Sequence, residues 1–88
     1  VLFRSGEFAE VSEKALKSLK IKGGAVVTGV HEGGLLDKAG IRRGSVITRI
    51  NNSTISSVND LNRITSAIES IEWSNPDGTR DRLLIMPK

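Results

Sequence analysis

The sequence offers one histidine, His31, which is followed directly by a carboxylate, Glu32. A histidine paired with an acid is what a general base needs when it activates a serine nucleophile. Adjacent residues of a strand point to opposite faces, however, and segment 30–32 ends an expected strand, so this acid cannot orient the ring. The chain also has no cysteine and no G-x-S-x-G motif. We therefore expect His31 to be an exposed strand-end residue, and we expect this chain by itself not to be an enzyme.

Other arrangements of reactive residues predict no cofactor. Metal sites need several convergent ligands, and the sequence holds a single histidine and no spaced aspartate cluster. The glycine-rich segment 29–34 lacks both the G-x-G-x-x-G spacing and the Lys-Ser/Thr pair of phosphate-binding loops, so we interpret its glycines as turn residues. Glu69 and Glu72 lie near an expected helix end, and we interpret them as surface charges.

Composition and charge narrow the class of protein further. The 88 residues are enough for one domain, and 38% hydrophobic with 26% charged residues is ordinary for a folded globular domain. The longest apolar run, 83–86, is far shorter than the roughly 20 residues of a membrane span. The net charge is +3, and Arg42-Arg43 is the only adjacent basic pair. No basic stripe with interleaved aromatic residues is present, so we expect no nucleic-acid partner.

Hydrophobic patterning predicts a mixture of short helices and strands. We expect a helix that begins at Ser12 and ends at Gly23-Gly24, and a single helical turn at 35–39 that Gly40 closes in the left-handed conformation. Expected strands cover 25–30, 45–50, 71–74 and 79–86, and segment 75–78 is a turn. Because no regular βαβ rhythm connects them, the predicted fold class is α+β, a mainly antiparallel sheet or partial barrel of about five strands with two to three helices.

Two of these predictions depend on periodicity. Segment 58–70 is expected to be the longest helix, because Ser57 and Asp60 form a capping signature. Apolar residues recur there at spacings of three and four, namely Val58, Leu61, Ile64, Ala67, Ile68 and Ile71. In strand 45–50, alternation places Val46, Thr48 and Ile50 on one face and Ile47 and Arg49 on the other.

Segments 24–30 and 34–51 carry a family resemblance. They read as a strand, a turn, a short helix ending in Ala39-Gly40-Ile41, two variable residues, Gly44, a small polar residue, and a strand ending in asparagine. This pattern resembles PDZ domains, most closely those that follow the protease domain in the HtrA/Deg family of serine proteases. The resemblance covers residues 8–86 and implies a PDZ-like fold in which Gly24, Gly40 and Gly44 have structural roles.

The resemblance implies a peptide-binding module. PDZ domains take an extended peptide as an added strand beside a long helix, and a glycine loop holds its terminal carboxylate. Residues 8–88 would form the domain, and 1–7 an N-terminal extension or cloning remnant that contributes to the carboxylate-binding loop. Carried over by position, the peptide-binding residues are Gly6, Glu7, Phe8, Leu61, Thr65 and Ile68. We expect peptides that end in an apolar residue.

The sequence departs from the family pattern in three respects. Ser45 stands where the family usually has aspartate. The carboxylate-binding loop, usually hydrophobic-Gly-hydrophobic, is represented by Ser5-Gly6-Glu7-Phe8, which places a negative charge near an incoming carboxylate. The family's catalytic G-N-S-G-G motif is absent.

Three functions are compatible with these residues. The first is a non-catalytic module that binds C-terminal or unfolded peptide segments and regulates or targets substrates to the protease domain of an HtrA-like serine endopeptidase. The second is a structural docking domain that binds no free peptide. The third is a PDZ insert of another class of protease. The resemblance implies a periplasmic or cell-envelope location, without direct membrane insertion.

Overall fold

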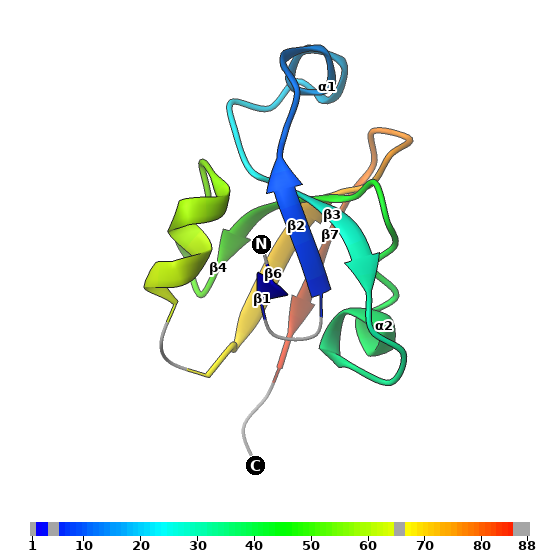
Figure 1. Cartoon of the computed structure of the whole chain (residues 1–88), viewed down its shortest axis with the longest axis vertical. Coiled ribbons are helices and arrows are strands. Elements are labelled where there is room, and N and C mark those ends of the chain that lie inside the picture. Colours follow the sequence, from blue (N-terminus) through cyan, green and yellow to red (C-terminus); the bar gives the residue numbers. More distant parts are fainter. Residues whose placement is uncertain (1, 4–5, 65–66, 86–88) are drawn as a thin grey trace.

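The computed structural model describes residues 2–3, 6–64 and 67–85, and within them the chain forms one antiparallel sheet (Figure 1). Strand order is β1-β2-β3-β4-β6-β7, and β5 pairs with β4 beside this path. The strands are β1 (Leu2–Phe3), β2 (Gly6–Glu10), β3 (Ala25–Val30), β4 (Val46–Ile50), β5 (Ser53–Thr54), β6 (Ser70–Ser74) and β7 (Arg80–Leu84). The helices are α1 (Glu13–Leu19), α2 (Leu35–Ala39) and the 3-10 helix η1 (Val58–Arg63). The predicted α+β class with a mainly antiparallel sheet is confirmed.

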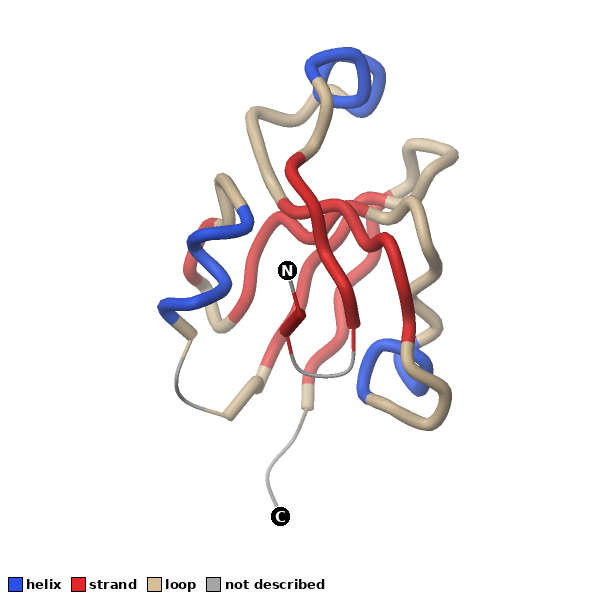
Figure 2. The backbone as a smooth tube through the Cα atoms, viewed as in Figure 1, coloured by secondary structure: helices blue, strands red, loops and turns tan. Residues whose placement is uncertain are grey.

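The curled sheet encloses one hydrophobic core. Its buried members come from β2, β3, β4, β6, α2, η1 and the segments between them: Phe8, Ala25, Val27, Leu36, Ile41, Ile47, Ile50, Ile55, Val58, Leu61, Ile71 and Trp73. Figure 2 shows the same arrangement as a tube, with α2 and η1 flanking the strands and α1 standing apart from them. No described residue of α1 is buried, so this helix contributes little to the core.

Strand β4 departs from the simple alternation predicted for it. A register irregularity against β6 lies between Ile47 and Arg49. Such a bulge changes which side chains face inward. As a result Ile47 and Ile50 share the same core although alternation placed them on opposite faces. Val46, which precedes the irregularity, is also buried.

Helix α1 begins where the sequence predicts it but ends earlier. The Ser12 hydroxyl accepts a hydrogen bond from the Ala15 amide at 3.2 Å, which caps the first turn. Lys20 takes the left-handed conformation with φ 57°, and the Ile21 amide donates to the Leu16 carbonyl at 3.0 Å. These bonds satisfy the terminal carbonyls before Gly23 is reached. The helix stop predicted at Gly23-Gly24 was therefore wrong by several residues.

The long helix predicted over 58–70 was also wrong. Of the residues in this segment that the structure describes, only η1 at its start is helical; residues 67–69 are not, and β6 begins at Ser70. The cause is the Asn51 side chain, whose Oδ1 accepts from the Glu69 amide at 2.6 Å and the Ser70 amide at 3.1 Å. Its Nδ2 also donates to the Ala67 carbonyl at 3.0 Å. These backbone groups would otherwise bond within a helix, so Asn51 offers them an alternative that leads into β6.

Gly40 lies at the end of α2 with φ 79° and ψ 16°, in the left-handed region. The Ile41 amide donates to the Leu36 carbonyl at 3.0 Å, so the bond that closes the helix depends on this conformation. A Cβ at Gly40 would meet no atom within 4 Å. Any cost of a side chain there therefore comes from the backbone rather than from crowding.

We predict that Gly40→Val lowers the free energy of unfolding by about 1–2 kcal/mol, because a β-branched residue is strained at positive φ. Urea denaturation at equilibrium measures the loss. Gly40→Asn is the control, since asparagine tolerates the left-handed region and should cost clearly less. Equal stability of the two variants would contradict a backbone origin.

Asp77 stands in the turn between β6 and β7 and accepts hydrogen bonds from Thr79. The Thr79 hydroxyl approaches Asp77 Oδ1 at 2.6 Å and the Thr79 amide at 2.9 Å. The hydroxyl bond is the largest cause that lowers the pKa of Asp77 below its ordinary value of 3.8, and the amide bond is the next. Since the folded pKa is the lower one, this carboxylate stabilises the fold above pH 3.8, and the contribution is lost as the pH falls through the folded pKa.

We predict that Thr79→Val raises the pKa of Asp77 toward 3.8, because the hydroxyl bond, the largest cause of its lowering, is lost. Carboxyl chemical shifts followed by NMR during an acid titration give the value directly. Thr79→Ser keeps a hydroxyl and should leave the pKa low. The same pKa in the valine variant and the parent chain would show that the hydroxyl has no effect.

Candidate functional site

The open side of β2 and the neighbouring η1 form the candidate groove, which we define as Gly6–Glu10 together with Val58–Arg63. One edge of β2 pairs with β3 along its whole length, and the other faces away from β3. On that outer edge β1 pairs with β2 at Leu2–Glu7 and Phe3–Gly6. The position of an added strand is therefore covered at its start by residues 2–3 in this structure (Figure 1).

A carboxylate from β2 fastens η1 in place. Glu10 Oε1 accepts a hydrogen bond from the Val58 amide at 2.6 Å. The first amides of a helix have no partner within the helix, so an acceptor from elsewhere is needed. Glu10 supplies it from another element, and this bond joins the two walls of the candidate groove in addition to the core contacts of Val58 and Leu61.

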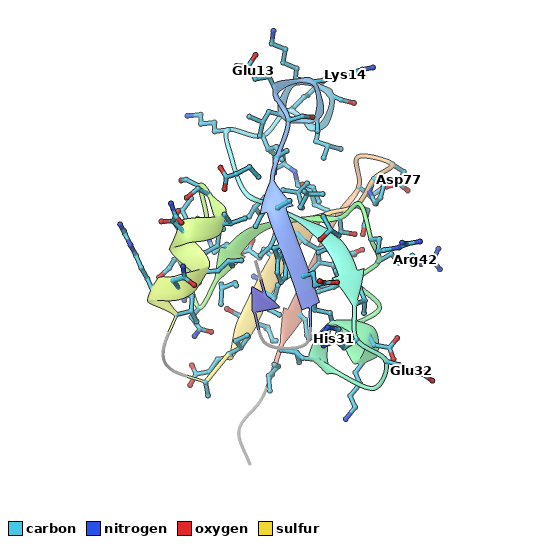
Figure 3. The ribbon with its side chains drawn as sticks, viewed as in Figure 1. Glu13, Lys14, His31, Glu32, Arg42 and Asp77 are labelled. Atoms are coloured by element: carbon cyan, nitrogen blue, oxygen red, sulfur yellow. The ribbon has the colours of Figure 1, made fainter. Side chains whose placement is uncertain are left out.

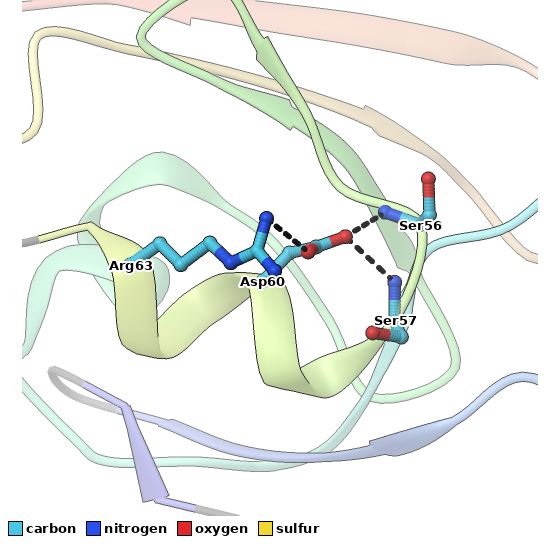
Figure 4. Close-up of polar contacts among 4 residues, drawn as sticks. All are labelled: Ser56, Ser57, Asp60 and Arg63. Atoms are coloured by element: carbon cyan, nitrogen blue, oxygen red, sulfur yellow. Dashed lines mark hydrogen bonds and ion pairs between the residues drawn. The ribbon is translucent and has the colours of Figure 1, made fainter.

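A second carboxylate, Asp60, holds the turn that precedes η1. Its Oδ2 accepts from the Ser56 amide at 2.7 Å and from the Ser57 amide at 3.2 Å (Figure 4). Arg63 Nη1 lies 3.8 Å from Asp60 Oδ1 and adds a loose ion pair on the outer surface. The capping signature predicted from Ser57 and Asp60 is thus used by the 3-10 helix, although the long helix does not form.

The three predicted residues on β2 lie in contrasting environments. Gly6 is buried, and a Cβ there would collide with Leu36 Cδ1. Glu7 is exposed. Phe8 is 3% exposed and belongs to the core. The loop that would hold a terminal carboxylate therefore presents one negative side chain, and its aromatic residue points inward.

Of the three predicted residues on the η1 side, the two that the structure describes do not share one helix. Leu61 has an exposed fraction of 0% and is a core residue. Ile68 lies beyond η1 in an irregular segment, where it is half-buried and packs against the core. Thr65 lies outside the described residues. The structure brings Phe8 and Leu61 into one core cluster, and the peptide-binding role of all six residues stays a prediction.

Glu10 was not identified from the sequence. It precedes the Ser12 cap and looks like a surface residue of a short strand. Its partner Val58 is 48 positions away, and no local pattern connects the two. The sequence indicates a missing acceptor only on the Val58 side of this bond. The first amides of a helix that begins at Val58 are more numerous than those that Asp60 alone can satisfy.

His31 lies directly after β3 and is exposed, as predicted for a strand-end histidine (Figure 3). Glu32 is exposed beside it in the same loop. Among residues 2–3, 6–64 and 67–85, no group of three or more His, Cys, Asp or Glu side chains is placed to hold a metal ion. No described helix is long and apolar enough to cross a membrane.

Comparison with known proteins gives two findings. The family model described as PDZ domain matches residues 26–70. A solved structure, the HtrA3 PDZ domain bound to a phage-derived ligand (FGRWV), is similar with a TM-score of 0.69 and 17% sequence identity. The alignment covers 92% of this chain and 79% of that one. At this identity the likeness establishes the fold. No curated protein matches the chain.

We predict that Glu10→Ala lowers the free energy of unfolding by about 0.5–2 kcal/mol, the range found when a helix-capping acceptor is removed. The start of η1 should also open more easily than before, because the Val58 amide then has no acceptor. Denaturation gives the first effect, and faster hydrogen exchange at the Val58 amide gives the second.

Glu7→Ala is the matched control for that experiment, since it removes an exposed carboxylate from the same strand. It should leave the Val58 exchange rate unchanged. If both variants behaved alike, Glu10 would not hold η1.

Proposed function

This chain belongs to the PDZ domain family, and we propose that it is a peptide-binding module which takes an extended segment along the candidate groove. The observation that carries the proposal is the Glu10–Val58 hydrogen bond, which holds a helix beside the outer edge of β2. Main-chain groups of such an edge can pair with an added strand. The similar HtrA3 domain was solved with a peptide ligand, which supports this reading.

The ligand we propose is an extended peptide that ends in an apolar residue. Ile64 and Ile68 are half-buried beside the core, and they offer apolar surface next to η1. Glu7 opposes a terminal carboxylate at the start of β2. A single added strand buries little surface, so we expect affinities of about micromolar to sub-millimolar.

In a parent protein, this module would present substrates to an HtrA-like serine protease domain in the periplasm or cell envelope. The support for this proposal is the sequence resemblance of segments 24–30 and 34–51 together with the likeness to an HtrA-type PDZ domain.

A docking domain that binds no free peptide is the second candidate. Phe8 and Leu61, two of the three apolar residues expected to line the groove, are almost completely buried. Residues 2–3 also cover part of the strand edge. Both features favour a closed groove whose outer surface serves as a contact between domains.

NMR titration of the labelled chain with a small set of apolar-ended peptides decides between the two. Because β1 covers the edge of β2, a variant that begins at Gly6 is titrated in parallel. Peptide binding predicts shifts that cluster on residues 6–11 and 58–68, and a several-fold gain in affinity for Glu7→Leu, which removes a like charge from the carboxylate end.

Glu32→Leu is the matched control, because it removes an exposed carboxylate from the β3–α2 loop, outside the candidate groove. It should leave the affinity unchanged. If no peptide shifts the groove resonances at millimolar concentration in either length of chain, with or without Glu7→Leu, the groove is closed and the docking function is favoured.

A further inference from the structure

A second concave surface lies away from the candidate groove and shares no residue with it. This surface, the distal hollow, is lined by the α1–β3 connection at 20–23, by Thr48 and 54–56, and by 72–74 with 80–81 across β6 and β7. Its volume is about 290 Å³. Ligand pockets usually begin at roughly this size, so the hollow suits one side chain with its backbone rather than a large cofactor.

The walls of the distal hollow are held by hydrogen bonds to backbone carbonyls and by the backbone conformation at the end of α1. The Gly24 amide donates to the Ser56 carbonyl at 3.2 Å and ties the α1–β3 connection to the segment after β5. Lys20 is held in the left-handed conformation that ends α1. The Thr48 hydroxyl donates to the Glu72 carbonyl at 3.3 Å between β4 and β6. The hollow is therefore already formed in the absence of any ligand.

Charge in the distal hollow is unbalanced. Three cationic residues line it, Lys20, Lys22 and Arg80, and none of them forms an ion pair with another described residue. Two carboxylates also line it. Glu72 lies 3.6 Å from the Arg49 Nε. Asp81 accepts from the Asn75 amide group at 2.8 Å, a neutral donor that does not balance the charge of the carboxylate. Three cations against two carboxylates leave the lining with a net positive charge.

An unsatisfied hydroxyl borders the same space. Ser74 lines the distal hollow and is 1% exposed, and its Oγ has no hydrogen-bond partner among the described residues. Buried polar groups are nearly always hydrogen-bonded, so an orphaned hydroxyl beside a hollow indicates a missing acceptor or donor. A carboxylate oxygen would accept from this hydroxyl and would also neutralise the cations around it.

We propose that the distal hollow binds an acidic side chain from a partner polypeptide. The half-buried Ile21 lines the same hollow, and it would contact the carbon atoms of such a side chain and its neighbours. A free inorganic anion would use the cations but leave this apolar surface open. The site is independent of the candidate groove, so the chain can hold a peptide on β2 and an acidic partner segment at the same time.

The test uses the labelled chain and the capped peptide acetyl-Gly-Glu-Glu-Leu-Gly-Ser-amide, followed by NMR. Shifts should cluster on residues 20–24, 73–74 and 80–81, and the affinity should fall as salt is added. The isosteric peptide with Gln-Gln in place of Glu-Glu should bind at least about tenfold more weakly. Shifts centred on residues 6–10, or equal binding of the two peptides, would overturn the proposal.

Charge reversal locates the site. Lys22→Glu combined with Arg80→Glu should weaken the acidic peptide by about tenfold or more. Lys14→Glu combined with Lys38→Glu is the matched control, because both lysines are exposed, lie outside the hollow and carry the same total charge (Lys14 is labelled in Figure 3). Equal losses of peptide affinity in the two double variants would show that the attraction comes from the overall charge of the chain, and would overturn the proposal.

Two further measurements examine the ligand chemistry. Ser74→Ala removes the orphaned hydroxyl, so the folded chain should be no less stable while the peptide binds about three- to tenfold more weakly. Inorganic phosphate should shift the same resonances only at much higher concentration than the peptide. Unchanged peptide affinity in Ser74→Ala, or phosphate binding as tight as that of the peptide, would overturn the assignment to a polypeptide.

Discussion

One partly buried hydrogen bond joins the two elements on which a PDZ-type groove depends. The amide of Val58 begins η1 and has no acceptor within its own helix. The Glu10 carboxylate, from a strand 48 positions earlier, provides that acceptor at 2.6 Å. Hydrogen bonds to a charged acceptor are stronger than neutral ones. Without this bond, η1 would rely on Asp60 and on the burial of Val58 and Leu61 to keep its place beside β2.

Features controlled by neighbouring residues could be predicted from the sequence. Ser12 caps α1 through a residue three positions away, and Gly40 closes α2 at the expected turn. The central pattern of strand, one-turn helix and strand led to the correct family for the same reason. The spacing of apolar residues in 58–71 did identify inward-facing side chains, because Ile64 and Ile68 still pack against the core. It did not identify the backbone conformation that carries them.

Features controlled by distant residues could not be predicted. Asn51 intercepts backbone groups at 67, 69 and 70, which replaces the second half of the expected helix. The bulge in β4 arises from its pairing with β6 and moves Ile47 into the core with Ile50. The expected groove lining stays a prediction for the same reason, since a single sequence does not distinguish an apolar residue facing a ligand from one facing the core. Phe8 and Leu61 belong to the second kind in this structure.

Helix α1 stands clear of the sheet, and none of its described residues is buried. The free energy needed to open it locally is therefore far below that of unfolding the whole domain. A protease can cut α1 when this helix opens, and a cut there would leave the pairing of β2 with β3 intact. The segment can thus vary in length and sequence, or be clipped, at little cost to the fold that carries it.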